Sequence, residues 1–155
     1  MIKTLTIEYE EIDNLTKLSA EDHKLVLEAR KALPKSYSPY SEFKVASAVR
    51  FEDGEIIIGT NQENVAYPSG LCGERVALFA AGSDARRRRV AAIAVVAFHN
   101  GQYVAAKPCG ACLQVMLETE KRASRPLIVI FALGNERFAK IKGVKNLMPF
   151  AFSEF

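Results

Sequence analysis

Two uninterrupted apolar segments constrain the fold of this chain more than any other feature of its sequence. They are VAAIAVVAF at 90–98 and LIVIFAL at 127–133. Such runs, rich in Val and Ile, are typical of strands that are buried on both faces of a sheet. Between them the sequence predicts a helix from Cys109 to about Ala123, which ends before Pro126. Alternation of buried strands with helices predicts an α/β fold with a mixed sheet that is covered on both faces.

Shorter segments extend this sheet and supply its other helices. Further strands are predicted at 43–50, 55–60, 137–141 and, from the loose alternation of Leu5, Ile7 and Tyr9, at 2–9. Asp53-Gly54 and Gly134-Asn135 are typical turn pairs between such strands. Two more helices are predicted, one from a capping box at Ser19-Ala-Glu-Asp22 to about Leu33 before Pro34, and one from Cys72 to about Ala81, closed by Gly82.

Size and composition bound the class of protein. The 155 residues, 49% of them hydrophobic, suffice for one domain spanning 1–155 with a real core. No apolar run approaches the 18 or so residues that span a bilayer, and MIKTLTIEYEEI lacks a signal-peptide core, so no membrane partner is expected. An odd cysteine count favours a reducing cytoplasm with free thiols. A net charge of +3 is too small to indicate nucleic-acid binding.

The three cysteines fall into one pattern, LCGER at 71–75 and PCGAC at 108–112. Cys72 and Cys109 are each expected at a helix start, where free N–H groups favour the thiolate. Cys112 shares a helical face with Cys109. Three thiolates can hold Zn²⁺ with its fourth position open, which is the arrangement of a catalytic zinc. A structural zinc, a redox pair and inert buried thiols remain alternatives, although neither His23 nor His99 has ligand spacing from a cysteine.

Two charged residues follow the first cysteine. Glu74 could take a proton from zinc-bound water, but an ordinary first-turn Glu that favours the helix dipole would look the same. Arg75 could donate to the sulfurs and drain their negative charge, or it could be a solvated surface Arg. The run Arg86–Arg89 could contact phosphates, but such a run is more often a solvated loop or an oligomer contact.

These segments together resemble the zinc-dependent nucleobase deaminases, and more narrowly the small homotetrameric cytidine deaminases. The resemblance covers most of the chain and is carried, in order, by SPYSEFKVASAV at 38–49, NQENVAY at 61–67, LCGERVAL at 71–78, PCGACLQV at 108–115 and LMPFAF at 147–152. It implies a three-layer α-β-α fold with a mixed sheet of about five strands, and the segment at 2–9 would be an extra strand. It also implies one Zn²⁺ per chain, a free nucleoside substrate and a homotetramer with shared sites.

The resemblance assigns roles by position. Cys72, Cys109 and Cys112 would bind zinc, Glu74 would shuttle protons, and Arg75 would donate to the thiolates. The Gly73 N–H would meet the pyrimidine O2, Phe43 would pack against the base, and Asn61 with Glu63 would hold the ribose 3′-hydroxyl. Tyr67 and Phe152 would reach a neighbouring subunit's site. An amide and a carboxylate two positions apart can bracket one hydroxyl as donor and acceptor, although two polar turn residues would give the same pattern.

Five positions depart from the family's pattern. Gly73 stands where Ala is usual, Ala46-Ser47 replaces Gly-Ala after Val45, Lys107 replaces Ser before Pro108, and Leu113 replaces an Arg after the last cysteine.

The expected reaction is hydrolytic deamination of cytidine and 2′-deoxycytidine to the uridines and ammonia, as in pyrimidine salvage. Three rivals remain: a deaminase of another small amine such as blasticidin S, a polynucleotide-editing deaminase that uses the arginine run, and an inactive zinc-binding homologue.

Overall fold

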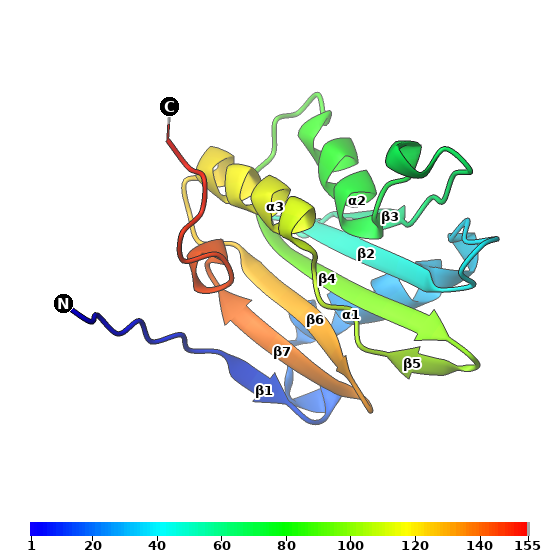
Figure 1. Cartoon of the computed structure of the whole chain (residues 1–155), viewed down its shortest axis with the longest axis horizontal. Coiled ribbons are helices and arrows are strands. Elements are labelled where there is room, and N and C mark those ends of the chain that lie inside the picture. The colour runs from blue at the N-terminus through cyan, green and yellow to red at the C-terminus, as the bar shows by residue number, and fades with distance from the viewer. Residues whose placement is uncertain (155) are drawn as a thin grey trace.

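A mixed sheet with helices on both faces forms the body of the protein in the computed structural model, which describes residues 1–154 (Figure 1). The strands are β1 (Glu10–Ile12), β2 (Lys44–Phe51), β3 (Ile56–Thr60), β4 (Val90–His99), β5 (Gln102–Val104), β6 (Ile128–Gly134) and β7 (Arg137–Lys142). The helices are α1 (Ala20–Ala32), α2 (Gly73–Gly82) and α3 (Gly110–Ala123). Short 3-10 turns lie at Leu15–Lys17, Leu33–Lys35, Tyr67–Ser69 and Val144–Asn146.

The strand order is β1-β7-β6-β4-β2-β3, and β5 pairs with the free end of β4. Only the pair β4–β6 is parallel among the strands described, because α3 provides the crossover between them. Helix α1 covers one face of the sheet, and α2 and α3 cover the other (Figure 1). The three-layer fold with a mixed sheet is therefore confirmed. The expected number of about five strands was too low, because β1 and β5 add two short edge pairings.

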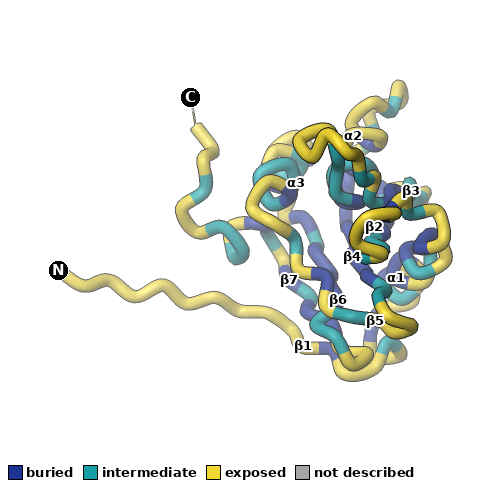
Figure 2. Tube along the Cα trace, turned by 45° about the vertical axis from the view of Figure 1, so that its right-hand side comes forward, coloured by how far each residue is buried: buried dark blue, intermediate teal, exposed yellow. Residues whose placement is uncertain are grey.

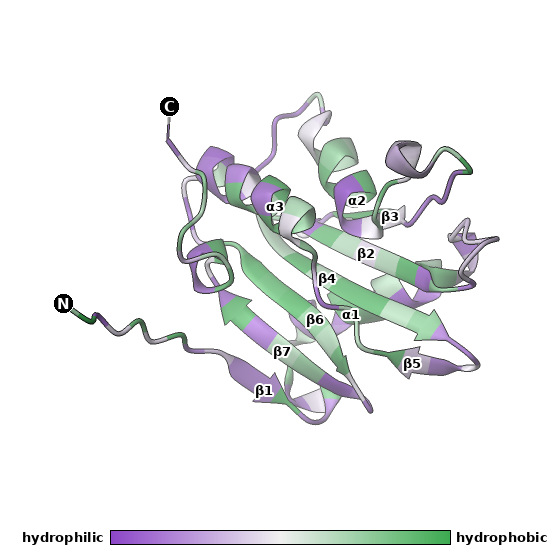
Figure 3. Cartoon of the chain, in the orientation of Figure 1, coloured by the Kyte–Doolittle hydropathy of each residue, from purple (hydrophilic) through white to green (hydrophobic). Residues whose placement is uncertain are grey.

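The core lies where the apolar runs predicted it. Residues Val90–Ala97 of β4 are all buried, and so are residues 129–132 of β6 (Figure 2). Figure 3 shows these central strands coloured mainly as hydrophobic, with the polar residues gathered at the loops and outer helix faces. Strands buried on both faces can carry no polar stripe, which is why their sequences read as continuous apolar runs. No helix among residues 1–154 is long and apolar enough to cross a bilayer.

Helix α1 begins as its sequence predicted, with one difference. The Ser19 hydroxyl oxygen accepts a hydrogen bond from the Asp22 N–H at 3.2 Å, which is the expected N-cap. The Asp22 side chain does not complete a capping box. Its carboxylate instead pairs with Arg50 of β2 at 2.9 Å and with Lys140 of β7 at 3.0 Å, beneath the helix. A single buried acid thus ties α1 to two strands of the sheet.

The N-terminal strand was predicted in the wrong place. Residues 2–9 form no strand, and β1 lies just after them at Glu10–Ile12, paired with β7. Alternation of side chains predicts extended backbone, but a strand also needs a partner, and the partner β7 reaches only from Phe138 to Lys140 in this pairing. Residues 1–9 run on from β1 as an exposed arm (Figure 2).

Candidate active site

Two helix N-termini bring the three cysteines together. Cys72 is the N-cap residue of α2 and Cys109 that of α3, and Cys112 lies in the first turn of α3. Neither cap sulfur accepts a hydrogen bond from the backbone of its own helix, so the sulfurs remain available to a ligand. The unpaired N–H groups and the positive dipole ends of both helices favour negative charge at this place.

The sulfur positions fit a zinc ion. The three Sγ atoms all lie within 4.8 Å of one another, and Cys109 Sγ lies 3.5 Å from Cys112 Sγ. A tetrahedral ion with Zn–S bonds of about 2.3 Å separates its sulfurs by about 3.8 Å, so only small side-chain movements are needed. Among residues 1–154 no other group of three His, Cys, Asp or Glu side chains is placed to hold a metal. Three ligands leave the fourth position open, as in a catalytic zinc site.

The thiols differ in their readiness to ionise. A hydrogen bond from the Cys112 thiol and the nearby Arg75 guanidinium lower the pKa of Cys72 to about 5. The same pairing with Cys72, together with burial, raises the pKa of Cys112. Arg75 Nη2 lies 3.8 Å from Cys72 Sγ, while its buried Nε has no hydrogen-bond partner in residues 1–154. The predicted contact between Arg75 and the thiolates is present at Cys72.

Glu74 occupies the first turn of α2 beside these sulfurs. Glu74 is only 4% exposed, and it lines the cavity in front of the cysteines. Burial raises the pKa of Glu74 to about 7, and the negative charge of Cys72 adds to that shift. A carboxyl group with such a pKa can both accept and donate a proton near neutral pH. An ordinary first-turn Glu would be solvated, so this burial favours a chemical role.

Helix α2 lies unusually close to the sheet at two glycines. A Cβ atom on Gly59 of β3 would stand 2.2 Å from the Ala77 nitrogen and 2.6 Å from the Gly73 carbonyl oxygen. A Cβ atom on Gly73 would stand 3.2 Å from the Val45 carbonyl oxygen. The absence of side chains therefore sets how deeply the helix that carries Cys72 and Glu74 can sit. Sequence analysis missed Gly59, although a lone glycine within a strand is a sign of close backbone approach.

A cavity of about 490 Å³ opens in front of the cysteines and Glu74. This volume is typical of a small-molecule site. Eight of the predicted site residues line it, namely Phe43, Asn61, Glu63, Tyr67, Cys72, Glu74, Arg75 and Cys109. Gly73 and Cys112 are buried beside it rather than in its wall, and Phe152 lies outside its lining. The structure thus brings residues from 43 to 109 of the sequence into one hollow.

Asn61 holds the wall of this cavity together. Its Oδ1 accepts hydrogen bonds from the Val45 N–H at 2.8 Å and the Ser36 hydroxyl at 2.5 Å, and its Nδ2 donates to the Phe43 carbonyl at 2.9 Å. One N–H of the amide has no partner in these bonds. Asn61 therefore fixes the segment that carries Phe43 and keeps a single donor for a ligand.

Glu63 is held in a similar way. Its carboxylate accepts from the Tyr40 N–H at 2.9 Å, from the Ser41 N–H at 3.2 Å and from the Ser41 hydroxyl. These hydrogen bonds, the hydroxyl's foremost, lower the pKa of Glu63 and keep it ionised. The two supporting serines, Ser36 and Ser41, were not singled out from the sequence, because nothing in a serine-rich loop tells which hydroxyl reaches which side chain.

The aromatic residues predicted at the site differ in their surroundings. Phe43 is half-buried at the cavity wall, and its ring lies 5.4 Å from that of His99. Tyr67 is 89% exposed at the cavity rim. Phe152 is also largely exposed, and its carbonyl oxygen accepts a hydrogen bond from Gln114 at 2.8 Å. The exposed ring of Tyr67 at the rim leaves surface that a second subunit can cover.

The residues that depart from the family's pattern lie in different surroundings. Ala46 is fully buried, and because side chains alternate along β2 it faces away from the cavity that Val45 lines. Ser47 is also fully buried, and its hydroxyl has no partner among the described residues. Lys107 is exposed and lines the cavity, which places a cation near its mouth. Leu113 packs against the hydrophobic core.

None of the four arginines at 86–89 lines this cavity. Arg88 pairs with Asp84 at 3.0 Å and with Asp53 at 3.2 Å, and its guanidinium lies 4.0 Å from the centre of the Phe51 ring. Arg86 pairs with Glu55 at 2.7 Å. Half of the arginine run is thus engaged with neighbouring acids and organises the loop between α2 and β4.

Comparisons with known proteins agree with this geometry. The zinc-binding region of the cytidine and deoxycytidylate deaminases matches residues 19–125. A cytidine deaminase of Sporosarcina psychrophila is 41% identical over 131 residues, which cover 84% of this chain and 90% of the relative. One of Halalkalibacterium halodurans is 48% identical over 94 residues, 61% of this chain and 68% of the relative. The crystal structure of cytidine deaminase from Burkholderia pseudomallei superposes with a TM-score of 0.72 at 37% identity, covering 87% of this chain and 100% of that one.

Proposed function

This chain belongs to the cytidine and deoxycytidylate deaminase family, and we propose on that premise which of its residues perform the hydrolysis. It is a zinc-dependent hydrolase that converts cytidine and water to uridine and ammonia, a reaction of pyrimidine salvage. 2′-Deoxycytidine is proposed as a second substrate. The observation that carries the assignment of residues is the convergence of three cysteine sulfurs and a buried Glu74 on one cavity.

Cys72, Cys109 and Cys112 hold the zinc ion in this proposal, and Arg75 donates to the Cys72 sulfur. Bound zinc supplies a water molecule whose pKa lies near 7. The guanidinium withdraws charge from a centre that three thiolates would otherwise make too electron-rich to activate water. The two helix N-termini support the thiolates in the same way.

Glu74 moves the protons. Its carboxylate accepts a proton from the attacking water and delivers it to ring N3 while the water oxygen bonds to C4. Glu74 then takes the remaining proton from the new hydroxyl group on C4 and passes it to the amino group. The C4–N bond breaks to release ammonia, and the C4–O bond becomes the carbonyl of uridine. One buried carboxyl group serves first as base and then as acid, and burial that holds its pKa near neutrality suits both steps.

The remaining cavity residues position the nucleoside. Asn61 and Glu63 hold the ribose 3′-hydroxyl, Phe43 packs against the base, and the Gly73 N–H meets the pyrimidine O2. The hydrogen bonds that Asn61 and Glu63 make to the 36–45 segment support this role, because they fix both side chains before substrate arrives. A preorganised pair loses little conformational entropy on binding.

The active assembly is proposed to be a homotetramer in which Tyr67 and Phe152 of each chain reach a neighbouring site. Their exposure supports this, as does the exposure of Phe79 on α2.

Residues 1–155 are proposed to form one domain, and the three free thiols favour a reducing cytoplasm as its location. No nucleic acid is proposed as a partner, because Arg86 and Arg88 are paired with acids.

The test is a substrate comparison with purified, zinc-replete protein. Cytidine, 2′-deoxycytidine, cytosine and blasticidin S are supplied separately, and ammonia release is measured for each. We expect turnover of the two nucleosides and none of cytosine, because the free base lacks the ribose that Asn61 and Glu63 bind. Turnover of blasticidin S alone, or of cytosine as fast as cytidine, would contradict the proposed substrate.

A further inference from the structure

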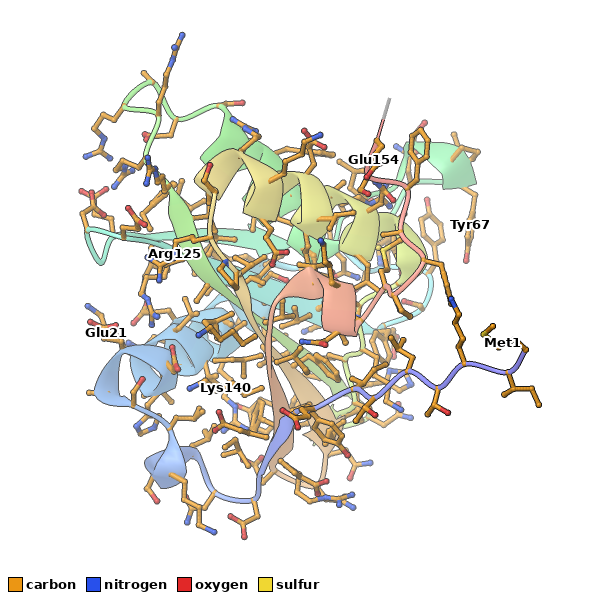
Figure 4. The ribbon with its side chains drawn as sticks, turned by 90° about the vertical axis from the view of Figure 1, so that its left-hand side faces the viewer. Met1, Glu21, Tyr67, Arg125, Lys140 and Glu154 are labelled. Atoms are coloured by element: carbon orange, nitrogen blue, oxygen red, sulfur yellow. The ribbon has the colours of Figure 1, made fainter. Side chains whose placement is uncertain are left out.

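Residues 1–9 form an extended arm that the proposed function leaves unused. The arm runs from β1 into solvent, and Figure 4 shows Met1 at its end, clear of the body of the protein. Every residue of the arm is exposed, including Ile2, Leu5, Ile7 and Tyr9, and Ile2 is 98% exposed. The arm and β1 also lie before residue 19, where the match to the deaminase family begins. With Met1, five exposed apolar side chains on nine residues require an explanation other than packing within this chain.

The arm continues an unpaired sheet edge. β1 is the last strand of the sheet order, and only its β7 side is paired among residues 1–154. Extended as a single strand, residues 2–12 would form one edge of 11 positions, with Leu5, Ile7, Tyr9 and Glu11 on one face and Ile2 and Ile12 on the other. A long apolar edge of this kind is a template for another strand.

We propose that the arm pairs with the same arm of a second copy of this chain, as antiparallel strands related by a two-fold axis at Ile7. In this register Ile7 faces Ile7 of the second copy, and Leu5 faces Tyr9. Lys3 faces Glu11, and Ile2 faces Ile12. Each of these four pairs joins apolar to apolar or cation to anion on the same face of the sheet, which is the arrangement that stabilises neighbouring strands. The other pairs, Thr4 with Glu10 and Thr6 with Glu8, join polar residues. The two sheets become one continuous sheet across the axis.

The charges and the apolar pattern of the arm favour this register over the registers whose axis is shifted by one residue in either direction. A two-fold axis perpendicular to the sheet pairs only residues on the same face, so the axis moves in steps of one residue along the arm. An axis at Glu8 would oppose two glutamates and place Leu5 against Glu11. An axis at Thr6 would place Ile2 against Glu10 and Lys3 against Tyr9. The axis at Ile7 alone among these three gives Ile2, Leu5, Ile7 and Tyr9 apolar partners and gives Lys3 an acid.

Glu11 supplies the acid for the proposed contact with Lys3 of the second copy. Its carboxylate accepts a hydrogen bond from Arg137 of β7 at 2.9 Å and its side chain stays 42% exposed, so Lys3 of the second copy would join this ion pair as a second cation. An isologous contact of this kind uses each pair twice. The arm therefore joins two subunits through edges that lie apart from the deaminase cavity, since no residue before Tyr40 lines that cavity.

Disulfide trapping tests the register directly on the zinc-bound full chain. An Ile7→Cys variant should form a disulfide-linked dimer under mild oxidation, because the two sulfurs meet at the axis. A Thr4→Cys variant is the matched control, since its two sulfurs would be about 20 Å apart across six residue steps. A mixture of Leu5→Cys and Tyr9→Cys chains should form linked heterodimers, whereas each variant alone should not. The unsubstituted chain reports any cross-linking through its own cysteines.

We expect at least about tenfold more linked dimer from Ile7→Cys than from Thr4→Cys, given the steep geometric demand of a disulfide. Equal cross-linking of the two variants, or none from Ile7→Cys, would overturn the proposal. Hydrogen exchange provides an independent measure. Alternate amides of residues 3–9, those that face the second arm, should be protected in the unsubstituted chain and should lose that protection in Ile7→Glu, which opposes like charges at the axis. Unprotected amides in the unsubstituted chain would also overturn it.

Discussion

Gly59 lies so close to Ala77 that α2 rests directly on β3, backbone against backbone. A Cβ atom added to Gly59 would stand 2.2 Å from the Ala77 nitrogen and 2.8 Å from its Cα. Cβ atoms do not approach backbone atoms this closely, so any side chain at 59 forces the helix away from the sheet. The N-terminus of the same helix carries Cys72 and Glu74, and its depth therefore sets where the proposed metal ligand and the proposed proton carrier lie.

Gly59→Ala should therefore damage both stability and activity. We expect the free energy of unfolding to fall by about 3 kcal/mol, the upper part of the usual range for overpacking, because the clash is with backbone. Zinc content and cytidine turnover should fall with it. Gly110→Ala is the matched control, because a Cβ atom on Gly110 meets nothing within 4 Å. Unchanged melting temperature and turnover in Gly59→Ala would show that α2 is not seated in this way.

Asp22→Asn should destabilise the protein although it lies far from the cysteines. The substitution leaves the guanidinium of Arg50 and the ammonium of Lys140 without their shared buried carboxylate. We expect a loss of about 3 kcal/mol, the lower end for breaking a buried ion pair, because Lys140 keeps some contact with solvent. Glu21→Gln is the control, since Glu21 is exposed and lies 3.6 Å from Arg50. Denaturant unfolding measures both variants, and equal losses would contradict the role of Asp22.

The stabilisation by Asp22 should also depend on pH. Burial alone would raise the pKa of Asp22, but hydrogen bonds from Lys140 and Arg50 outweigh it and lower that pKa below its ordinary value of 3.8. A carboxyl group with a lowered pKa in the folded state stabilises above its unfolded pKa, and the stabilisation disappears as the pH falls through the folded pKa. The difference in unfolding free energy between the unsubstituted chain and Asp22→Asn should be constant above about pH 5 and shrink below about pH 4. A difference that grows on acidification would refute this sign.

Asn61→Asp should separate the two uses of this side chain. The acid keeps an oxygen for the Val45 N–H but replaces the N–H that donates to the Phe43 carbonyl with a second acceptor. We expect KM for cytidine to rise and the unfolding free energy to fall by about 1 to 3 kcal/mol, the cost of an unpaired buried polar group. Ser36→Ala, which removes only the third hydrogen bond, is the milder control. A rise in KM without loss of stability would mean that Asn61 binds substrate but does not hold the wall.

Arg75→Gln should lower turnover with little effect on folding. The variant loses the cation that lies 3.8 Å from Cys72 Sγ and leaves the thiolates more electron-rich. Changes of this kind around a metal typically cost about 10- to 100-fold in activity or metal affinity. Arg125→Gln is the control, because Arg125 is paired with Glu52 at the surface. Zinc content and kcat are measured together, and normal values of both in Arg75→Gln would contradict the contact's importance.

The sequence predicted the three cysteines of the metal site better than the residues that position the site. Cys72, Cys109 and Cys112 could be recognised because metal ligands require particular residue types at particular spacings. The burial of Glu74 could not be predicted, since it depends on how deeply α2 lies, and that depth is set by Gly59 at a distance of more than ten residues. The second role of Asn61 was also hidden, because its partners Ser36, Phe43 and Val45 become neighbours only when β2 and β3 pair.

The fold was predictable where burial is extreme and less so at the sheet edges. β4 and β6 were predicted almost to the residue because strands buried on both faces leave no polar positions. β5 was missed, since Gln102–Val104 has three residues and continues a turn at Asn100-Gly101. The N-terminal strand was displaced because its alternation extends over residues that have no partner within this chain. Whether a segment at the edge of a sheet forms a strand depends more on a neighbouring strand to pair with than on the intrinsic β-propensity of its residues.

The central claim is that Glu74 carries the protons at a zinc centre built by the three cysteines. The most direct measurement is single-turnover conversion of cytidine by Glu74→Gln, with zinc content determined on the same sample. The amide keeps the size of the side chain but cannot accept a proton, so we expect zinc at one ion per chain and turnover reduced by about 10²- to 10⁴-fold. Turnover close to that of the unsubstituted protein, with zinc retained, would contradict the account.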